Sequence, residues 1–412
     1  MRAERLELAA RGGDFRIDKD RPSPEWIASL RRRFVTETEI DRVLTRKMQR
    51  RSGPGFAPLK LETLVQGVDS LIRSQFSGDF QITDARWLSG GASKLQMAFR
   101  LHWQRPGVGA DVTPMVLRME PAESIVETSR LREFQLIKAF EGVVPVPPVF
   151  WCDAEGEHLP HPALVYGFAE GVAKPTSGVG GVTGIGTQLP VALRAKLAPQ
   201  FVDHLAKIHT FDFSGKDLSA FDKPSVGTTQ CALWGVNWWE RVWEEDSDED
   251  IPLVRLCAAW LRENPPLLDR AVIVHSDYRL GNFLFTEHDT RISAWLDWEL
   301  GRIGDRHQDI AWTTSTAFGH LAEDGKTFLT CGLLPEQAFL EAYEQRSGLK
   351  VDPRAVHWYK VYNSYTMATL LFATGYRIAH NGKTHQDVLV TWLMGIGYML
   401  LDEMRELIEG AP

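Results

Sequence analysis

The stretch VIVHSDYRLGNFLF, residues 272–285, places a His, an Asp, an Arg and an Asn between two apolar runs. The β-branched and aromatic residues on both sides predict two short strands, with the polar part as the turn between them. Asp and Asn favour turns because they bond their own backbone. A turn does not, however, require two acceptor-rich side chains five positions apart, so Asp277 and Asn282 are candidates for holding a ligand.

A third short run, ISAWLDWEL (292–300), contains Asp297 just after its apolar part. We expect Asp277, Asn282 and Asp297 to meet at the ends of adjacent strands in a hairpin-like arrangement. One carboxamide and one or two carboxylates form a sparse oxygen set that suits Mg²⁺, which keeps waters and takes its remaining ligands from substrate phosphates. Asp277 would then be able to accept a proton from an attacking hydroxyl.

Length and composition limit the classes of protein. The 412 residues exceed one ordinary core, so two or three substructures are expected. A hydrophobic share of 44% and a charged share of 24% are typical of a soluble globular protein. The net charge of −8 argues against broad nucleic-acid binding, which needs a basic face. The four cysteines form no CxxC pair, which favours free thiols over a structural zinc site.

Membrane and export signals are not predicted. The first residues carry charge but no apolar core of a signal peptide, so a cytoplasmic protein is expected. The apolar stretch VLVTWLMGIGYMLL, residues 388–401, is shorter than the roughly 20 residues of a membrane span. It is therefore predicted to be a buried core helix.

The chain divides into three segments by pattern. Residues 1–75 are rich in charge and helix formers, and Ser23-Pro24 predicts a helix start. Residues 76–170 contain runs typical of strands and one helical run at 124–142. Residues 171–412 are mainly helical apart from the strands around 272–300, and the Gly-rich 172–187 is predicted to be a surface loop. The predicted strands are FQITDARWL (80–88), LQMAFRLHW (95–103), PMVLRME (114–120) and ALVYGF (163–168).

Three further runs have two interpretations each. The basic run 46–51 is predicted to be a solvated helix end rather than an anion site, and the acidic run 244–250 a solvated loop rather than a cation site. The tryptophans of CALWGVNWWERVW (231–243) form one helical stripe, which favours a core-facing side over an acceptor-binding wall. The aromatic stretch 358–372 would suit an apolar acceptor as well as a cationic one.

The segments HSDYRLGNFLF (275–285) and WLDWELGRIGDRHQDIAW (295–312) resemble the signature of the aminoglycoside phosphotransferase and choline kinase-like family. That family's pattern is H-G-D-x-x-x-x-N, then I-D-W/F-E, then G-D-P-x-x-D-L-A. By position, the resemblance implies Asp277 as catalytic base and Asn282 and Asp297 as Mg²⁺ ligands. It also implies that His275 braces the loop and that Asp309 anchors it. Ser276 replaces the usual Gly, and Arg306 the usual Pro; neither change removes a metal-binding or proton-moving group.

The upstream half matches the family's nucleotide-binding lobe. The resemblance implies that Arg118 binds phosphate and pairs with Glu133. Tyr166 would precede the hinge, whose backbone from Gly167 to Ala169 would bind the adenine edge. His209 would be structural. The glycine-containing turn would approach the phosphates through Ser89, Gly90, Gly91, Ala92 and Ser93.

The implied fold is an α+β, bilobal protein kinase-like fold. Its small lobe (76–170) would be an antiparallel sheet with one main helix, its large lobe (171–412) mainly helical, and residues 1–75 a helical extension. The implied activity is transfer of the γ-phosphoryl group of ATP, with Mg²⁺, to a hydroxyl of a small molecule. An apolar or metabolic alcohol is favoured over an aminoglycoside. The alternative is a catalytically idle kinase-like module that binds a nucleotide or a partner.

Overall fold

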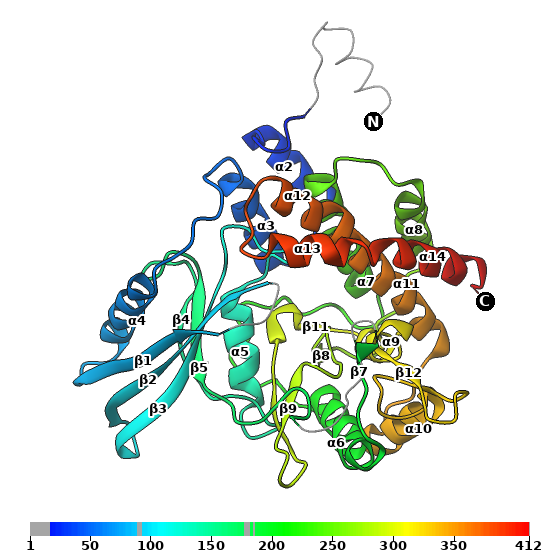
Figure 1. The fold of residues 1–412 in the computed structure, drawn as a ribbon. Helices are drawn as coiled ribbons and strands as arrows, with labels where there is room; N and C mark the ends of the chain where they lie inside the picture. The colour runs from blue at the N-terminus through cyan, green and yellow to red at the C-terminus, as the bar shows by residue number, and fades with distance from the viewer. Residues whose placement is uncertain (1–16, 89–92, 177–181, 184–185, 412) are drawn as a thin grey trace, which may run out of the picture.

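The computed structural model describes residues 17–88, 93–176, 182–183 and 186–411. The chain forms a small lobe around a five-stranded antiparallel sheet and a larger, mainly helical lobe (Figure 1). The strand order in the sheet is β1-β2-β3-β5-β4. The predicted α+β bilobal fold is confirmed.

The small-lobe sheet contains the four predicted strands and one more. The strands are β1 (Phe80–Trp87), β2 (Leu95–Arg105), β3 (Gly109–Met119), β4 (Val149–Asp153) and β5 (Ala163–Gly167). Side chains alternate along β3, so Leu117 packs into a core on one face while Val116 packs into the core on the other.

Two helices cover this sheet, one on each face, whereas one main helix was predicted. Helix α4 (Leu61–Gln75) covers the outer face, where Leu64, Val68 and Leu71 join the core of the sheet. Helix α5 (Arg130–Phe140) lies on the inner face toward the large lobe (Figure 1). It begins later than predicted, because Ser129 caps its first turn. The division of the chain at residue 75 stays a prediction, but α4 itself contributes to the core of the small lobe.

The N-terminal helices pack on the large lobe. Helix α2 (Pro24–Arg33) begins as predicted, with the Ser23 hydroxyl accepting the Trp26 N–H at 3.2 Å. Helix α3 (Thr38–Arg50) follows and lies against α7 (Gln230–Asp246). The extension is therefore part of the folded body over these helices.

The predictions of solvated side chains are wrong at two residues of each charged run, because these residues of one run pair with those of the other. Lys47 of α3 lies 2.7 Å from Glu245 and 3.0 Å from Asp246, and Arg51 lies 2.6 Å from Asp246. All four side chains are buried. We refer to Lys47, Arg51, Glu245 and Asp246 as the α3–α7 network.

The large lobe is built around α11 (Pro353–Thr369), which contacts α7, α8, α9 and α14. Its aromatic side chains Trp358, Tyr359, Tyr362 and Tyr365 are buried. On α7, Trp238, Trp239 and Trp243 are buried as the core-facing interpretation predicted. The other helices are α6 (Val191–Thr210), α8 (Pro252–Glu263), α9 (His307–Thr313), α10 (Glu336–Ser347), a π-helical turn (Leu370–Gly375), α12 (Tyr376–His380), α13 (Asp387–Met394) and α14 (Gly397–Glu409).

Of the short strands around the 272–300 segment, the second and third pair with each other in the hairpin-like arrangement that was expected, whereas the first does not pair with the second. Strand β8 (Val272–Val274) pairs with β11 (Arg302–Gly304), while β9 (Phe283–Phe285) pairs with β10 (Ile292–Trp295). The segment between β8 and β9 is too long for a tight turn and carries the chain from one pair to the other. The lobe also has two-residue strands, namely β6 (Val182–Thr183), β7 (Gly186–Thr187), β12 (His320–Leu321) and β13 (Phe328–Leu329).

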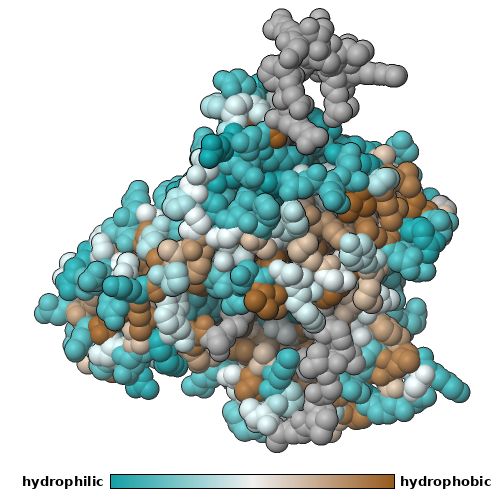
Figure 2. All heavy atoms as spheres, turned by 45° about the horizontal axis from the view of Figure 1, so that its top comes forward, coloured by the Kyte–Doolittle hydropathy of each residue, from teal (hydrophilic) through white to brown (hydrophobic). Residues whose placement is uncertain are grey.

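The prediction of a buried helix over 388–401 is wrong. The segment forms α13 and the start of α14, which lie across the surface of the large lobe (Figure 1). Val388 is 80% exposed, Trp392 62% and Met399 73%, while Val390 and Leu400 face the core. Figure 2 shows apolar side chains among the polar ones on the face turned toward the viewer. Across the described ranges, no helix combines the length and the apolar character that crossing a membrane would require.

Candidate functional site

The loop after β8 is held by a buried carboxylate. One Asp309 oxygen accepts the His275 N–H at 2.8 Å, and the other accepts the Ser276 N–H at 2.7 Å. The His209 Nε2 lies 3.1 Å from the same carboxylate, and its Nδ1 lies 2.9 Å from the Tyr343 hydroxyl. The predicted anchoring role of Asp309 and structural role of His209 are confirmed by these contacts.

Ser276 shows why the family places glycine at this position. Its φ of +66° lies in the left-handed region, which a residue with a Cβ adopts only at a cost. The bond from its N–H to Asp309 and one from Gln308 Nε2 to its hydroxyl, at 3.2 Å, hold this conformation. Serine therefore adopts the left-handed conformation at this position.

His275 joins the loop to the segment before Asp297. Its Nε2 donates to the Leu296 carbonyl at 3.0 Å, and its Nδ1 accepts the Asp277 N–H at 3.3 Å. Both ring nitrogens are used in the neutral imidazole, as the predicted bracing role requires.

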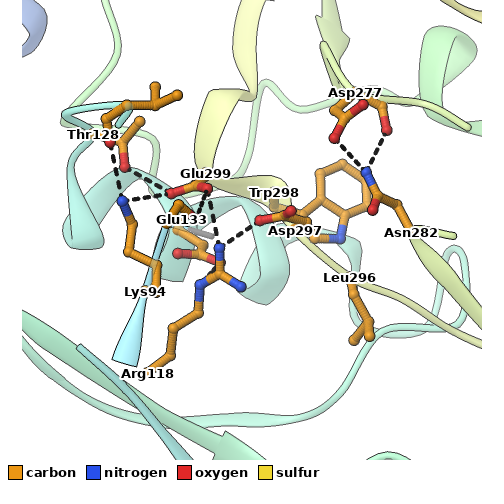
Figure 3. Close-up of polar contacts among 12 residues, drawn as sticks. Lys94, Arg118, Thr128, Glu133, Asp277, Asn282, Leu296, Asp297, Trp298 and Glu299 are labelled. Atoms are coloured by element: carbon orange, nitrogen blue, oxygen red, sulfur yellow. Dashed lines mark hydrogen bonds and ion pairs between the residues drawn. The ribbon is translucent and has the colours of Figure 1, made fainter. Parts of the chain in front are cut away.

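The Asp277 carboxylate is oriented by three side-chain donors. Arg279 Nε at 2.8 Å and Trp312 Nε1 at 2.7 Å donate to one oxygen. Asn282 Nδ2 donates to the other oxygen at 2.5 Å and to the Asp277 carbonyl at 2.9 Å (Figure 3). Sequence reasoning missed Arg279 and Trp312, although both lie inside the two signature segments.

Asp297 lies on the other side of the site, between the loop and the small lobe (Figure 3). Its φ is +65°, its side chain is 31% exposed, and one carboxylate oxygen pairs with Arg118. Burial raises its pKa, although Arg118 acts in the opposite direction. A partly exposed acidic residue with a left-handed backbone among buried residues is a feature of functional sites.

Arg118 pairs with Glu133 of α5 at 3.3 Å, so the predicted pair forms. Arg118 also lies 3.2 Å from Glu299. Lys94, which sequence reasoning missed, lies 2.9 Å from both Glu120 and Glu299. Its place directly after the glycine-containing turn was the available signal. We refer to Lys94, Arg118, Arg130, Glu120, Glu133, Asp297 and Glu299 as the active-site network.

Glu299 of the large lobe forms ion pairs with three basic side chains of the small lobe. Lys94, Arg118 and Arg130 of the small lobe all lie within 3.2 Å of its carboxylate. Burial alone would raise the pKa of Glu299, but these cations outweigh it and hold the pKa well below its usual value. Ser93, expected near the phosphates, donates its hydroxyl to Glu299 at 2.8 Å. Ser89, Gly90, Gly91 and Ala92 lie outside the described residues.

Two of the three backbone amides of the hinge, those of Gly167 and Phe168, are already hydrogen-bonded within the small lobe. The Gly167 N–H already donates to Pro148 O at 2.8 Å, and the Phe168 N–H to Pro114 O at 2.9 Å. In the described part of the chain, the Ala169 N–H makes no hydrogen bond. The binding of the adenine edge by the backbone from Gly167 to Ala169 stays a prediction, and the Ala169 N–H is the amide of this segment that remains without a partner among the described residues. Burial raises the pKa of the neighbouring Tyr166 to about 12, so its phenol stays neutral.

The donor set at Asn282 and Asp297 fits a hard divalent cation. The Asn282 amide nitrogen is committed to Asp277, which leaves its carbonyl oxygen as the acceptor. No hydrogen bond reaches this oxygen within the described ranges. Asp297 adds a partly exposed carboxylate with one oxygen outside the Arg118 pair. Oxygen ligands of these two kinds are those that Mg²⁺ takes.

A small antiparallel-sheet lobe joined to a helical lobe, with these acidic and amide side chains at the junction, defines a kinase-like phosphotransferase. Residues 88–359 match the model of the phosphotransferase enzyme family. The chain belongs to this family.

Solved structures share the fold. A Ralstonia eutropha JMP134 protein classed among the aminoglycoside phosphotransferases covers 84% of this chain and 99% of its own, with a TM-score of 0.61 and 21% identity. An ethanolamine kinase from Plasmodium vivax covers 97% of this chain and 96% of its own, with a TM-score of 0.50 and 12% identity. At these identities the likeness shows the fold alone.

The curated relatives are named as members of the acyl-CoA dehydrogenase family rather than as phosphotransferases. Human acyl-CoA dehydrogenase family member 11 is 27% identical over 201 residues, which cover 48% of this chain and 24% of the relative. The Gallus gallus protein of the same name is 32% identical over 118 residues, covering 28% of this chain and 15% of the relative. The matches thus span less than a quarter of the length of these relatives.

Proposed function

We propose that the protein transfers the γ-phosphoryl group of ATP to a hydroxyl of a small molecule, with Asp277 as the base. The observation that carries this proposal is the Asp277 carboxylate, fixed by Trp312, Arg279 and Asn282 beside Asp297. A base must be aimed at its proton before it can act, and three donors on one carboxylate supply that aim.

Asn282 and Asp297 would hold Mg²⁺ through the Asn282 carbonyl oxygen and the Asp297 carboxylate. The ion would neutralise charge on the phosphates, and Arg118 would bind the same phosphates from the small lobe. Arg118 is suited to this because its guanidinium already bridges Glu133, Glu299 and Asp297 and carries several donors. The carbonyl of Gly167 and the N–H of Ala169 would bind the adenine edge.

In the reaction, the acceptor oxygen bonds to the γ-phosphorus as the bond from that phosphorus to the bridging oxygen breaks. ADP leaves with that oxygen, and Asp277 takes the hydroxyl proton. Because most of the catalysis lies in positioning and charge neutralisation, the fixed geometry of Asp277 and the cations of the active-site network are the contributions of this chain.

The relatives bear on the acceptor. Proteins named as acyl-CoA dehydrogenases contain a region similar to this chain. We take this as support for an acceptor from acyl-chain metabolism rather than an aminoglycoside.

The test is Asp277→Asn, with Asp203→Asn as the matched control. Asp203 makes the same kind of carboxylate contact on the exposed surface of α6, at 2.9 Å from Lys207. ADP release is measured with Mg-ATP and a broad panel of small alcohols. Asp277→Asn is expected to lose roughly 10²- to 10⁴-fold in kcat, the usual contribution of general-base catalysis, with unchanged ATP affinity. Equal activity of wild type and Asp277→Asn on a confirmed substrate would refute the base assignment.

A further inference from the structure

Helix α5 presents one of its faces to the active-site network. Glu133 lies 3.3 Å from Arg118, the residue proposed to bind phosphate, and Arg130 lies 3.1 Å from Glu299 (Figure 3). Arg130 and Glu133 share this face because residues three positions apart are neighbours on a helix surface. The position of α5 therefore decides whether Glu133 can pair with Arg118.

A different face of α5 contacts the N-terminal extension. Ser129 and Arg132 lie on this face, again three positions apart. Arg132 Nη1 lies 2.9 Å from a carboxylate oxygen of Glu37, which precedes α3, and the Ser129 hydroxyl donates to Glu39 in the first turn of α3. Glu37, Ser129 and Arg132 are buried. The extension thus contacts directly the helix that belongs to the active-site network.

Arg132 joins three parts of the molecule. Besides its pair with Glu37, its Nη2 donates to the Gly301 carbonyl of the large lobe at 3.3 Å. Its guanidinium carbon lies 4.2 Å from the centre of the Phe221 ring. The Arg132 side chain is 3% exposed, and Glu37 is the only carboxylate that pairs with it among the described residues. A buried cation without an opposite charge is costly, so loss of Glu37 favours a shift of α5 that brings Arg132 closer to water.

The two faces are coupled because they belong to one short helix. Arg132 and Glu133 are adjacent in the sequence, so a displacement of the first moves the second. A misplacement of about 1 Å, caused far from the reacting groups, can lower a rate by about 10²-fold. In protein kinases, the ion pair between the small-lobe cation and the glutamate of its helix must be in place for activity. The contacts made by the extension therefore bear on the pair of Glu133 with Arg118.

We propose that Glu37 and Glu39 are positioning residues, which hold α5 where Glu133 meets Arg118. This inference rests on the proposed function, because it takes Arg118 as a phosphate-binding residue. The N-terminal extension then supports nucleotide binding through α5 rather than by contact with the nucleotide. Its role differs from that of the α3–α7 network, which attaches the same helix α3 to the large lobe.

The test compares two acidic residues at the start of α3 in the full chain. Glu37→Gln removes the charge that faces Arg132. Asp41→Asn is the matched control, because Asp41 pairs with Arg31 and with Arg241 of α7, and with no residue of α5 among those described. Three quantities are measured for each protein, namely the Mg-ATP affinity by calorimetry, the amide exchange of α5 without nucleotide, and the stability by chemical denaturation.

Glu37→Gln is expected to weaken Mg-ATP binding roughly fivefold or more, the lower end of typical coupling between two sites. The amides of α5 should exchange faster, because the helix has lost a buried contact. Glu37→Asp, which keeps the charge, should retain part of the affinity. Asp41→Asn should leave the affinity and the exchange of α5 at their wild-type values, even where it lowers stability.

Glu39→Ala provides a second variant in case Glu37→Gln folds poorly. It removes the acceptor of the Ser129 hydroxyl but leaves no buried cation behind, because Arg42 is 38% exposed and keeps Glu155 at 2.6 Å. Weaker Mg-ATP binding and faster exchange of α5 are expected here as well, to a smaller extent.

The proposal is overturned if Glu37→Gln and Glu39→Ala bind Mg-ATP as the wild type does. It is also overturned if Asp41→Asn changes the affinity and the exchange of α5 as much as Glu37→Gln does, since both would then act through stability alone. A wild-type protein that binds no Mg-ATP would count against the proposed function. The exchange of α5, measured without nucleotide, would then decide the positioning role by itself.

Discussion

The active-site network and the α3–α7 network are built from the same kinds of ion pair but differ in their access to solvent. The four side chains of the α3–α7 network are at most 2% exposed, and each cation lies close to a carboxylate. The active-site network reaches solvent at Asp297, whose side chain is 31% exposed. Arg118 there is shared among three carboxylates. A sealed network is suited to holding helices together, whereas one with a solvent-facing carboxylate and a shared cation is suited to exchanging partners with a ligand.

The largest expected effect is on stability, through the α3–α7 network. Asp246→Asn leaves Lys47 and Arg51 buried without this partner, and breaking a buried ion pair costs about 3–5 kcal/mol of unfolding free energy. Chemical denaturation measures the change, while kcat of the folded fraction is expected to remain unchanged. Loss of less than about 1 kcal/mol would show that the network is not structural.

The same residue predicts an acid dependence. Lys47 and Arg51 outweigh burial and hold the pKa of Asp246 below its usual value. Its contribution to stability is therefore present above the unfolded-state pKa near 4 and is lost as the pH falls below that value. Asp246→Asn should make the stability less dependent on pH in this acidic range.

The next largest effect is expected in the active-site network. Asp297→Asn is expected to lower kcat by roughly 10²- to 10³-fold, a loss usual for one electrostatic group at a reacting phosphate or oxyanion. Stability should change little, because Arg118 keeps Glu133 and Glu299. Calorimetry with Mg-ATP would show weaker binding; unchanged affinity would contradict the metal-binding role.

A smaller effect concerns Glu127, beside the active-site network. Burial and the nearby Glu120 raise its pKa to about 7. Between the unfolded value near 4.5 and about 7, the folded protein keeps a proton that the unfolded chain releases, so stability falls as the pH rises. Because the side chain is only partly buried by surface area, we expect a loss of about 1 kcal/mol across this window.

Glu127→Gln tests this directly. The amide oxygen can still accept the Ser124 N–H, which donates to Glu127 at 2.8 Å. Unfolding curves at mildly acidic and mildly basic pH should then show a smaller difference than in the wild type. An identical pH dependence in the two proteins would rule out Glu127 as its source.

The smallest effect is at Ser276. Glycine relieves the left-handed strain of about 1 kcal/mol but loses the Gln308 hydrogen bond and gains unfolded-state entropy. Ser276→Gly should therefore change the unfolding free energy by less than about 1 kcal/mol. Ser276→Val, which is strained in the same conformation, is the contrasting variant and should be clearly destabilised.

Sequence reasoning succeeded where the chemistry is local. Asp277 and Asn282 lie in the first of the two signature segments, and Asp309 lies in the second. The contacts of these residues could be predicted because they belong to one motif. It failed for Lys47 with Asp246, which are 199 positions apart, because charge in a sequence gives no sign of a distant partner. The exposed Trp392 shows the same limit, since an apolar run does not reveal which surface, if any, covers it.

Arg302 is a third case. Nothing local distinguishes it from the other buried arginines, and only the structure shows that its side chain contacts Gln308 and Cys231 and, among the described residues, no carboxylate within 4.0 Å. Gly235 was similarly uninformative, because the close approach that requires it involves Arg302 and Tyr362 from other elements. A property that is defined by the absence of a contact can be recognised only when the positions of all neighbouring residues are known.

Helix α4 has a practical consequence for anyone preparing shortened versions of this protein. The family match starts at residue 88, yet Leu64, Val68 and Leu71 close the outer face of the sheet from upstream. A recombinant fragment cut at the family boundary would display that apolar face to water and remove the first strand. Such a truncation is expected to aggregate on expression, whereas one starting before residue 61 keeps the cover in place.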